Sequence, residues 1–357
     1  MQHAWIDGGP APFDAAIERA AQLLQASRLP LFAGLDTDVA GVRAAIALAE
    51  RTGGVVDHMD SDAMLRDIAV MREAGMMVTV PSEACLRADC VLVVGDALAA
   101  DPAVRERLLG SGAARQVYWL CPGRGAGQKD AAAVKRVGRD PRELPALLAA
   151  LRARLAGRPI GPAPLPLKQI DALAAELRGA RFGVAVWAAA QLDAVVIEML
   201  CGLVADLNAS TRFTGLPLAD PAARAVIEVC GWMTGFPVRT GFNRGYPEHD
   251  PWTYDAVRLV ESGESDCAVW IASTRDAAPP WQRNVPTIAL VGDEEAVPQA
   301  AVRIAVGRPG RDHDAVTGYD NAGTLVAVPA SAPSARPPVA TVLAAIAAAT
   351  NGGAWPC

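Results

Sequence analysis

The stretch GGVVDHMDSDAML, residues 53–65, carries polar side chains in a place where chemistry is expected. Its pattern predicts a short buried strand, then a polar loop, then the start of a helix. Ligands of open α/β sheets bind at the carboxyl ends of strands, so this loop is a candidate site. His58, Asp60 and Asp62 lie there with no cysteine beside them. The stretch therefore predicts either a working site or a site that has lost its chemistry.

A second candidate is the glycine-rich stretch CPGRGAGQKD, residues 121–130, which follows a predicted strand. Glycines there would let backbone N–H groups approach a phosphate. The spacing G-x-G-x-G differs from the dinucleotide pattern G-x-G-x-x-G, and no clear helix start follows. A plain surface loop is the alternative interpretation.

A third candidate is the aromatic block of residues 230–260, which is dense in Trp, Phe, Tyr, Arg and Gly. Ordered loops of this composition line pockets or interfaces. Arg239 and Arg244 could hold an anion there, and His249 could move protons near neutral pH. On residue types alone, a packed irregular connection is an equal alternative.

Two further patterns argue against metal or hydrolase chemistry. Asp312, His313 and Asp314 are adjacent in the chain, and an extended backbone would point alternate side chains to opposite faces, which favours a solvated loop over a metal site. No G-x-S-x-G or H-E-x-x-H motif occurs. The seven cysteines include no C-x-x-C pair, so they predict buried thiols rather than iron–sulfur or structural zinc ligands.

Composition narrows the class of protein. The chain has 357 residues, 52% hydrophobic and 20% charged, which is typical of a well-packed globular protein of about two domains. Its net charge of −6 argues against nucleic acid or an anionic membrane as a partner. No apolar run approaches the ~18 residues that span a bilayer, and the first residues lack a secretory pattern. These features predict a cytoplasmic protein.

Apolar strands alternate with helical patterns, which predicts parallel sheets covered on both faces. We expect an α/β protein with a first Rossmann-like domain over 1–155, a Pro-rich linker over 156–168, a second α/β domain over 169–292, and a segment over 293–357 that packs back on the first domain. The expected strands are 29–35, 76–80, 90–96, 115–122, 181–187, 266–273, 285–292 and 301–306, and helices are expected at 39–53 and 339–351.

The order of several stretches resembles the B subunit of formylmethanofuran dehydrogenase, a molybdenum- or tungsten-pterin enzyme. The stretch GFNRGYPEHDPWTYDAVRLVESGESDCAVWIAS carries the resemblance most specifically, and LPLFAGLDTDVAGVRAAIALAERTGGVVD and SEACLRADCVLVVGD precede it in the family's order. The resemblance implies the molybdopterin oxidoreductase type of fold, with two Rossmann-like parallel-sheet domains.

Departures from the family pattern imply lost chemistry. Active members carry an amino-terminal cysteine-rich segment for an iron–sulfur cluster, whereas the first cysteine here is Cys85, so we expect the iron–sulfur domain to be lacking. Members also have a Cys-His pair after the second strand, and Ala63 and Met64 stand at those positions. Neither side chain coordinates molybdenum or tungsten as a thiolate does. We therefore expect no cofactor and no metal, and a vestigial pocket formed by His58, Asp62, Ala63, Met64, Arg244, Tyr246 and His249.

This pattern is similar to that of the B subunit in the bacterial formyltransferase/hydrolase complex. There, formyl groups pass from formyl-tetrahydromethanopterin to a methanofuran-like carrier and are hydrolysed to formate. The resemblance implies a non-catalytic structural subunit whose partners are the formyltransferase, the zinc hydrolase and the C subunit. Two alternatives remain: an active pterin-dependent dehydrogenase subunit, in which Arg244 and His249 serve the substrate, and a nucleotide-binding protein that uses GRGAG. We expect Arg244 to lie in the vestigial pocket near residues 58–64.

Overall fold

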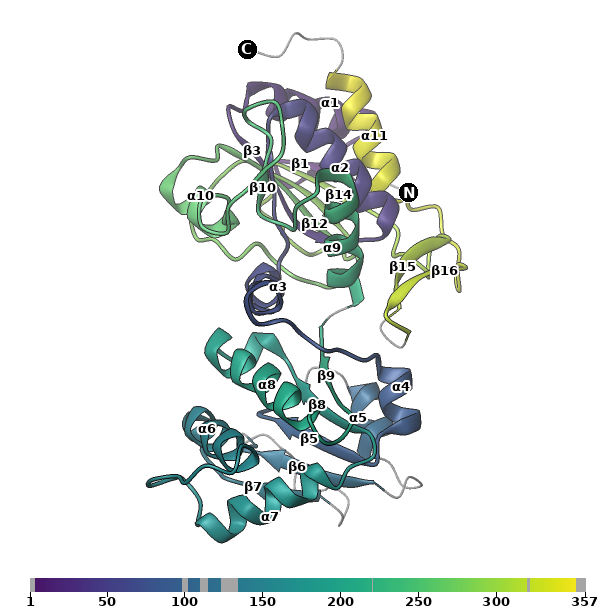
Figure 1. The fold of residues 1–357 in the computed structure, drawn as a ribbon. Coiled ribbons are helices and arrows are strands. Elements are labelled where there is room, and N and C mark those ends of the chain that lie inside the picture. The colour runs from purple at the N-terminus through teal and green to yellow at the C-terminus, as the bar shows by residue number, and fades with distance from the viewer. Residues whose placement is uncertain are drawn as a thin grey trace. The chain divides into compact units, whose positions relative to one another are not determined.

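The computed structural model describes residues 4–97, 102–109, 115–122, 134–219, 221–319 and 322–350. Strands and helices alternate and form two compact units (Figure 1). Unit 1 comprises residues 1–61, 221–319 and 324–357, and unit 2 comprises residues 62–220 and 320–323. The predicted α/β class with parallel sheets is confirmed.

Unit 1 is built on a nine-stranded sheet with the order β11-β10-β4-β3-β12-β13-β14-β1-β2. The five strands from β4 to β14 are parallel, and the outer strands pair antiparallel. The strands are β1 (Ala4–Ile6), β2 (Gly9–Pro10), β3 (Pro30–Asp36), β4 (Val55–Val56), β10 (Thr240–Gly241), β11 (Glu248–His249), β12 (Cys267–Ala272), β13 (Thr287–Val291) and β14 (Val302–Ala305); a separate hairpin joins β15 (Ala315–Tyr319) and β16 (Thr324–Val328).

Helices of unit 1 cover the sheet and explain its long apolar strands. The helix α11 packs against α1 and α2, and α2 packs against α9. Figure 1 shows α10 on the opposite side of the sheet from this group. All residues of β3 are buried, because a central parallel strand is covered on both faces. The helices are α1 (Phe13–Ala26), α2 (Val39–Thr52), α9 (Pro221–Thr234), α10 (Ala256–Ser262) and α11 (Val339–Thr350).

Local signals define the ends of α2, which follows β3. Asp38 is its N-cap, and its carboxylate accepts a hydrogen bond of 2.9 Å from the Gly41 N–H. Gly53 ends the helix at a φ of +63°, in the left-handed region that glycine adopts without steric cost. The chain then enters β4, so these two signals place the loop after β4 beside the end of β3.

Unit 2 is built on a fully parallel sheet with the order β7-β6-β5-β8-β9. In β5, Cys90, Leu92 and Val94 pack in one hydrophobic cluster with α6, α7 and α8, whereas Val91 and Val93 pack in another with α4 and α5. The continuous apolar run therefore serves both faces. The elements are β5 (Cys90–Val94), β6 (Gln116–Leu120), β7 (Val134–Val137), β8 (Gly183–Trp187), β9 (Phe213–Pro217), α3 (Ser61–Ala74), α4 (Pro81–Arg87), α5 (Pro102–Leu109), α6 (Leu144–Leu155), α7 (Leu167–Arg178) and α8 (Ala194–Leu207), with 3₁₀ turns at Pro141–Glu143 and Ala189–Gln191.

The compact units divide the chain differently from the predicted domain boundaries. The Pro-rich stretch 156–168 joins α6 to α7 inside unit 2, and β12 to β14 join β3 and β4 in the sheet of unit 1. The reason is that a strand pattern specifies a strand but not its pairing partner, which is distant in sequence here. The last helix, α11, packs against α1 and α2 near the amino-terminal end of the chain.

The predicted strand at 76–80 is a single bridge rather than a strand. Val78 bridges to Gly215, whose N–H donates to the Met77 carbonyl at 2.7 Å. Pro81 begins α4 immediately afterwards, which limits the extended segment. Separately, no helix among the described residues is long and apolar enough to cross a membrane.

Candidate functional site

Charged side chains gather at the carboxyl ends of β4, β3 and β12, three neighbouring parallel strands of unit 1. Asp36 ends β3, Asp57 and His58 follow β4, and Arg275 follows β12. This is the sheet edge at which ligands bind in α/β proteins. The loop 57–61, which is part of the candidate stretch 53–65, thus lies at the expected edge.

The carboxylate of Asp36 organises the loop after β12. It accepts hydrogen bonds from the N–H groups of Thr274 at 2.9 Å and Arg275 at 2.7 Å, and from the Thr274 hydroxyl. The pairing register between β3 and β12 shifts just before Asp36, where Gly34 has a φ of +83°. A Cβ on Gly34 would clash with the Ile271 carbonyl oxygen, so the close approach requires glycine.

Asp57 is a buried carboxylate that joins three segments of unit 1. It accepts hydrogen bonds of 2.9 Å from the N–H groups of His58 and Ala256, and one from the Ser61 hydroxyl. Arg239 lies 3.5 Å away and also pairs with Asp255 at 2.5 Å. Burial raises the pKa of Asp57 to about 6, although Arg239 and the hydrogen bonds oppose the shift.

His58 is buried and held in one tautomer. Its Nδ1 accepts a 3.0 Å hydrogen bond from the Asp60 N–H, so the proton of the neutral ring is on Nε2. Burial lowers its pKa to about 4, so the ring is neutral at pH 7. The carboxylate of Asp60 pairs with Arg275 at 2.8 Å. Nε2 is buried and has no hydrogen-bond partner among the described residues.

The remaining residues of the loop region lie on α3 and belong to unit 2. Asp62 is exposed, Ala63 packs against the hydrophobic cluster of unit 2, and Met64 is buried. The Ala63 side chain has no atom that can ligate a metal, and Met64 offers only a neutral thioether sulfur. No group of three His, Cys, Asp or Glu side chains suited to a metal ion occurs in the ranges that the structure describes.

The expectation for Arg244 needs correction. Its side chain is 66% exposed and pairs with Glu248 at 3.2 Å. The reason is the register of β10, which runs antiparallel to β4: Thr240 pairs with Val56 and Gly241 with Val55. The chain thus runs from Arg239 toward the amino end of β4, away from the loop 57–61. Arg239, not Arg244, is the arginine beside Asp57.

The other residues of the aromatic block lie around the β10–β11 hairpin. His249 pairs with Thr240, and its Nδ1 donates to the Arg239 carbonyl at 3.0 Å. The His249 ring stacks on Phe236 with centroids 6.2 Å apart. Tyr246 is exposed. The grouping of these residues with Ala63 and Met64 in one vestigial pocket stays a prediction.

Two other candidates from the sequence remain to be placed. Residues 123–133, which include most of the glycine-rich stretch, lie outside the described residues. Asp312 accepts from the Arg308 N–H at 2.7 Å and Asp314 from the Ala330 N–H at 2.8 Å. Asp312 therefore fixes a turn, and Asp314 joins the start of β15 to the chain after β16.

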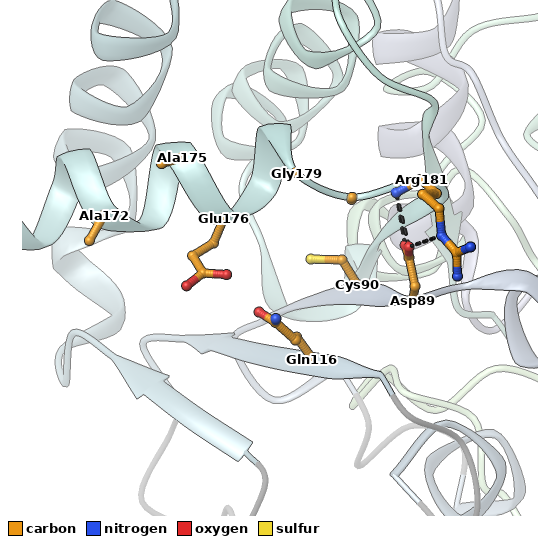
Figure 2. Close-up of a pocket in the computed structure, with 9 residues that line it drawn as sticks. Asp89, Cys90, Gln116, Ala172, Ala175, Glu176, Gly179 and Arg181 are labelled. Carbon is orange, nitrogen blue, oxygen red and sulfur yellow. Dashed lines mark hydrogen bonds and ion pairs between the residues drawn. The ribbon is translucent and has the colours of Figure 1, made fainter.

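A cavity in unit 2 has a volume of about 560 Å³. Figure 2 shows Cys90 and Gln116 on its floor, Glu176 on α7 above them, and Asp89 bonded to Arg181 at its end. Cys90 and Gln116 are the first residues of β5 and β6. The cavity is thus at the amino ends of these strands, opposite to the edge where ligands of α/β sheets bind.

Similarity to known proteins decides the family. No protein-family model matches the sequence. The chain is 37% identical over 347 residues to the B subunit of the formyltransferase/hydrolase complex Fhc (FhcB) of Methylorubrum extorquens, covering 94% of this chain and 93% of the relative. The chain belongs to the FhcB family. The recognition made from the sequence is confirmed.

The structures agree with this assignment. The fold matches a chain in the X-ray structure of the FhcABCD complex of M. extorquens with methylofuran, with a TM-score of 0.87, 36% identity, and coverage of 98% of this chain and 99% of that one. The B subunit of the tungsten-containing formylmethanofuran dehydrogenase 2 is more distant. The identity is 28% for Methanocaldococcus jannaschii, over 73% of this chain and 64% of the relative, and 25% for Methanococcus maripaludis, over 87% and 75%.

Sequence reasoning missed part of the charged cluster in this member of the FhcB family. Asp57 lay within the first quoted stretch and Asp36 ends a strand, but their partners Arg239 and Arg275 come from segments about 200 residues away in sequence. An Asp at a strand end is the available signal for Asp36. No local pattern identifies Arg275.

Proposed function

We propose that this chain is the FhcB component of a formyltransferase/hydrolase complex and acts there as a structural subunit without a cofactor of its own. The observation that carries the proposal is the similarity to FhcB along nearly the whole of both chains. The complex converts formyl-tetrahydromethanopterin, through a formylated methanofuran analogue, to formate. The formyltransferase, the zinc hydrolase and the C subunit are the proposed partners, and the proposed location is the cytoplasm.

The residues at the inferred pterin–metal position do not fit such a group. In the family that the sequence resembles, a cysteine thiolate at this position ligates the metal, and Ala63 and Met64 offer no thiolate. The Ala63 side chain packs against the core of unit 2, and Met64 is 5% exposed. We propose that the two sheets derive from a molybdopterin oxidoreductase fold, an origin favoured by the similarity to the tungsten-containing dehydrogenase subunits.

The test is to co-express the chain with the other three kinds of subunit from the same organism. We expect a stable complex that releases formate from the formylated carrier, and no assembly or activity when the chain is omitted. Metal analysis of the purified complex should find no stoichiometric tungsten or molybdenum. Stoichiometric tungsten or molybdenum together with formate-dependent reduction of a dye would support the dehydrogenase alternative instead.

A further inference from the structure

The segment 232–252 of unit 1 exposes an unusual number of large apolar side chains. Trp232 and Trp252 are 54% and 75% exposed. By contrast, Trp119, Trp187, Trp270 and Trp281 are buried. A concentration of large exposed apolar side chains in one segment favours an interaction site. The exposed side chains of the segment, called the aromatic surface below, are Trp232, Met233, Phe236, Tyr246 and Trp252.

Contacts within unit 1 hold the segment in one shape. Phe236, just after α9, stacks on His249 in β11. Arg239 Nη1 donates to the Pro251 carbonyl at 2.8 Å, which fastens the chain next to Trp252. The surface is therefore preorganised, and little conformational entropy remains to be lost when a partner binds.

The location of the surface leaves it open to a partner. β11 is the terminal strand of the nine-stranded sheet, so no described strand of this chain continues the sheet beyond it. An unpaired strand edge is a place where another chain can add. Aromatic side chains bury about 150–250 Å² each when they are fully covered, and the four here are between 39% and 75% exposed. They therefore supply roughly half of the ~800 Å² that each side of a stable interface contributes.

The charges around the surface indicate which kind of occupant fits it. Arg244 pairs with Glu248 at 3.2 Å, and Arg258 pairs with Glu264 at 2.5 Å. Arg239 pairs with Asp255. Because these charges are satisfied within unit 1, the surface does not select a strongly charged ligand. Trp, Tyr, Phe and Met are instead the residues enriched at the centres of protein interfaces.

We infer that the aromatic surface binds an apolar face of another subunit of the formyltransferase/hydrolase complex. This inference rests on the proposed function. The chain whose fold matches this one over 99% of its length lies in the FhcABCD complex, which contains three other kinds of subunit, FhcA, FhcC and FhcD. The occupant is one of those subunits, not a second copy of this chain and not a nucleic acid.

The test compares three substitutions with a matched control in the co-expressed complex. Trp232→Ala, Phe236→Ala and Trp252→Ala each remove an exposed side chain, and Leu86→Ala does the same on α4 of unit 2, where Leu86 is 84% exposed. Mass photometry over a dilution series measures the apparent Kd of the chain from the complex. We expect at least a tenfold increase for Trp252→Ala and little change for Leu86→Ala. Equal assembly of all variants, or an equal loss for Leu86→Ala, overturns the inference.

A second measurement uses the unaltered chain, so it does not depend on how a variant folds. Hydroxyl-radical footprinting should show Trp252 oxidised in the isolated chain and protected in the complex. Equal oxidation in both overturns the inference while leaving the proposed function intact. Failure of the unaltered chain to assemble refutes the proposed function itself. Dimerisation of the isolated chain that Trp252→Ala abolishes assigns the surface to a second copy and also overturns the inference.

Discussion

Replacing Arg239 with alanine should destabilise unit 1 strongly. The Arg239 side chain is 12% exposed, lies 3.5 Å from the carboxylate of buried Asp57, and lies 2.5 Å from that of Asp255. Removing one partner of a buried pair leaves the other charge without compensation, which costs about 3–5 kcal/mol. At roughly 2–4 °C per kcal/mol for a unit of this size, the unit 1 transition should fall by roughly 6–20 °C in differential scanning calorimetry.

Arg244→Ala is the matched control, because Arg244 also pairs with a carboxylate but is exposed. Its transition should stay within experimental error of the unaltered chain. Hydrogen exchange should locate the effect of Arg239→Ala in the 55–61 loop and at the start of α10, where Asp57 accepts from the Ala256 N–H. The Arg239→Ala defect should also grow as pH rises, since ionised Asp57 then lacks its cation. An equal loss for the two variants would refute the register argument and the assignment of Arg239 to the site.

Three further outcomes follow from single residues. Burial raises the pKa of Asp57 from 3.8 to about 6. Protonation of Asp57 in the folded state therefore stabilises unit 1 fully below about pH 4, and this stabilisation is lost as the pH rises through 6. Asp57→Asn should reduce the loss of unfolding free energy with pH, as measured by urea unfolding at pH 4, 5, 6 and 7. Gly34→Ala should destabilise unit 1, because the added Cβ meets the Ile271 carbonyl and the φ is positive; thermal unfolding no lower than that of the unaltered chain would contradict this. Trp187→Phe should lower the unfolding free energy of unit 2 by about 1–3 kcal/mol, because it removes the 3.1 Å hydrogen bond from Trp187 Nε1 to the Asp67 carboxylate. Burial already raises the pKa of Asp67 to about 6, and a carboxyl-group NMR titration should show a further rise in the variant.

The sequence was informative about individual elements and much less so about their pairing. Apolar runs located β3, β5, β12 and β13 within one or two residues, because central parallel strands are apolar on both faces. The same runs could not indicate that β12 pairs with β3 across more than 200 residues. For this reason the domain boundaries placed at 156–168 and 292 do not coincide with the compact units.

The candidate site shows the same division between local and distant information. The loop 57–61 was identifiable because a polar run follows a buried strand, and the structure places it at the ligand-binding edge of the sheet. Arg244 was favoured over Arg239 because the resemblance implies that the arginine of the RGYP motif faces the active centre, but a motif does not specify strand register. The antiparallel pairing of Thr240 with Val56 decides which arginine approaches Asp57, and that pairing depends on the folded sheet.

The discontinuous composition of unit 1 determines when it can fold during synthesis. Residues 62–220 are nearly all of unit 2, so that unit is almost complete once this stretch has left the ribosome. The sheet of unit 1 needs β12, β13 and β14, and therefore chain up to Ala305. The apolar strand β3 must wait, without its neighbour β12, while more than 200 further residues are made. Because non-local pairing forms slowly and unpaired strands aggregate, the amino-terminal 61 residues should be the part of the nascent chain that depends most on chaperones.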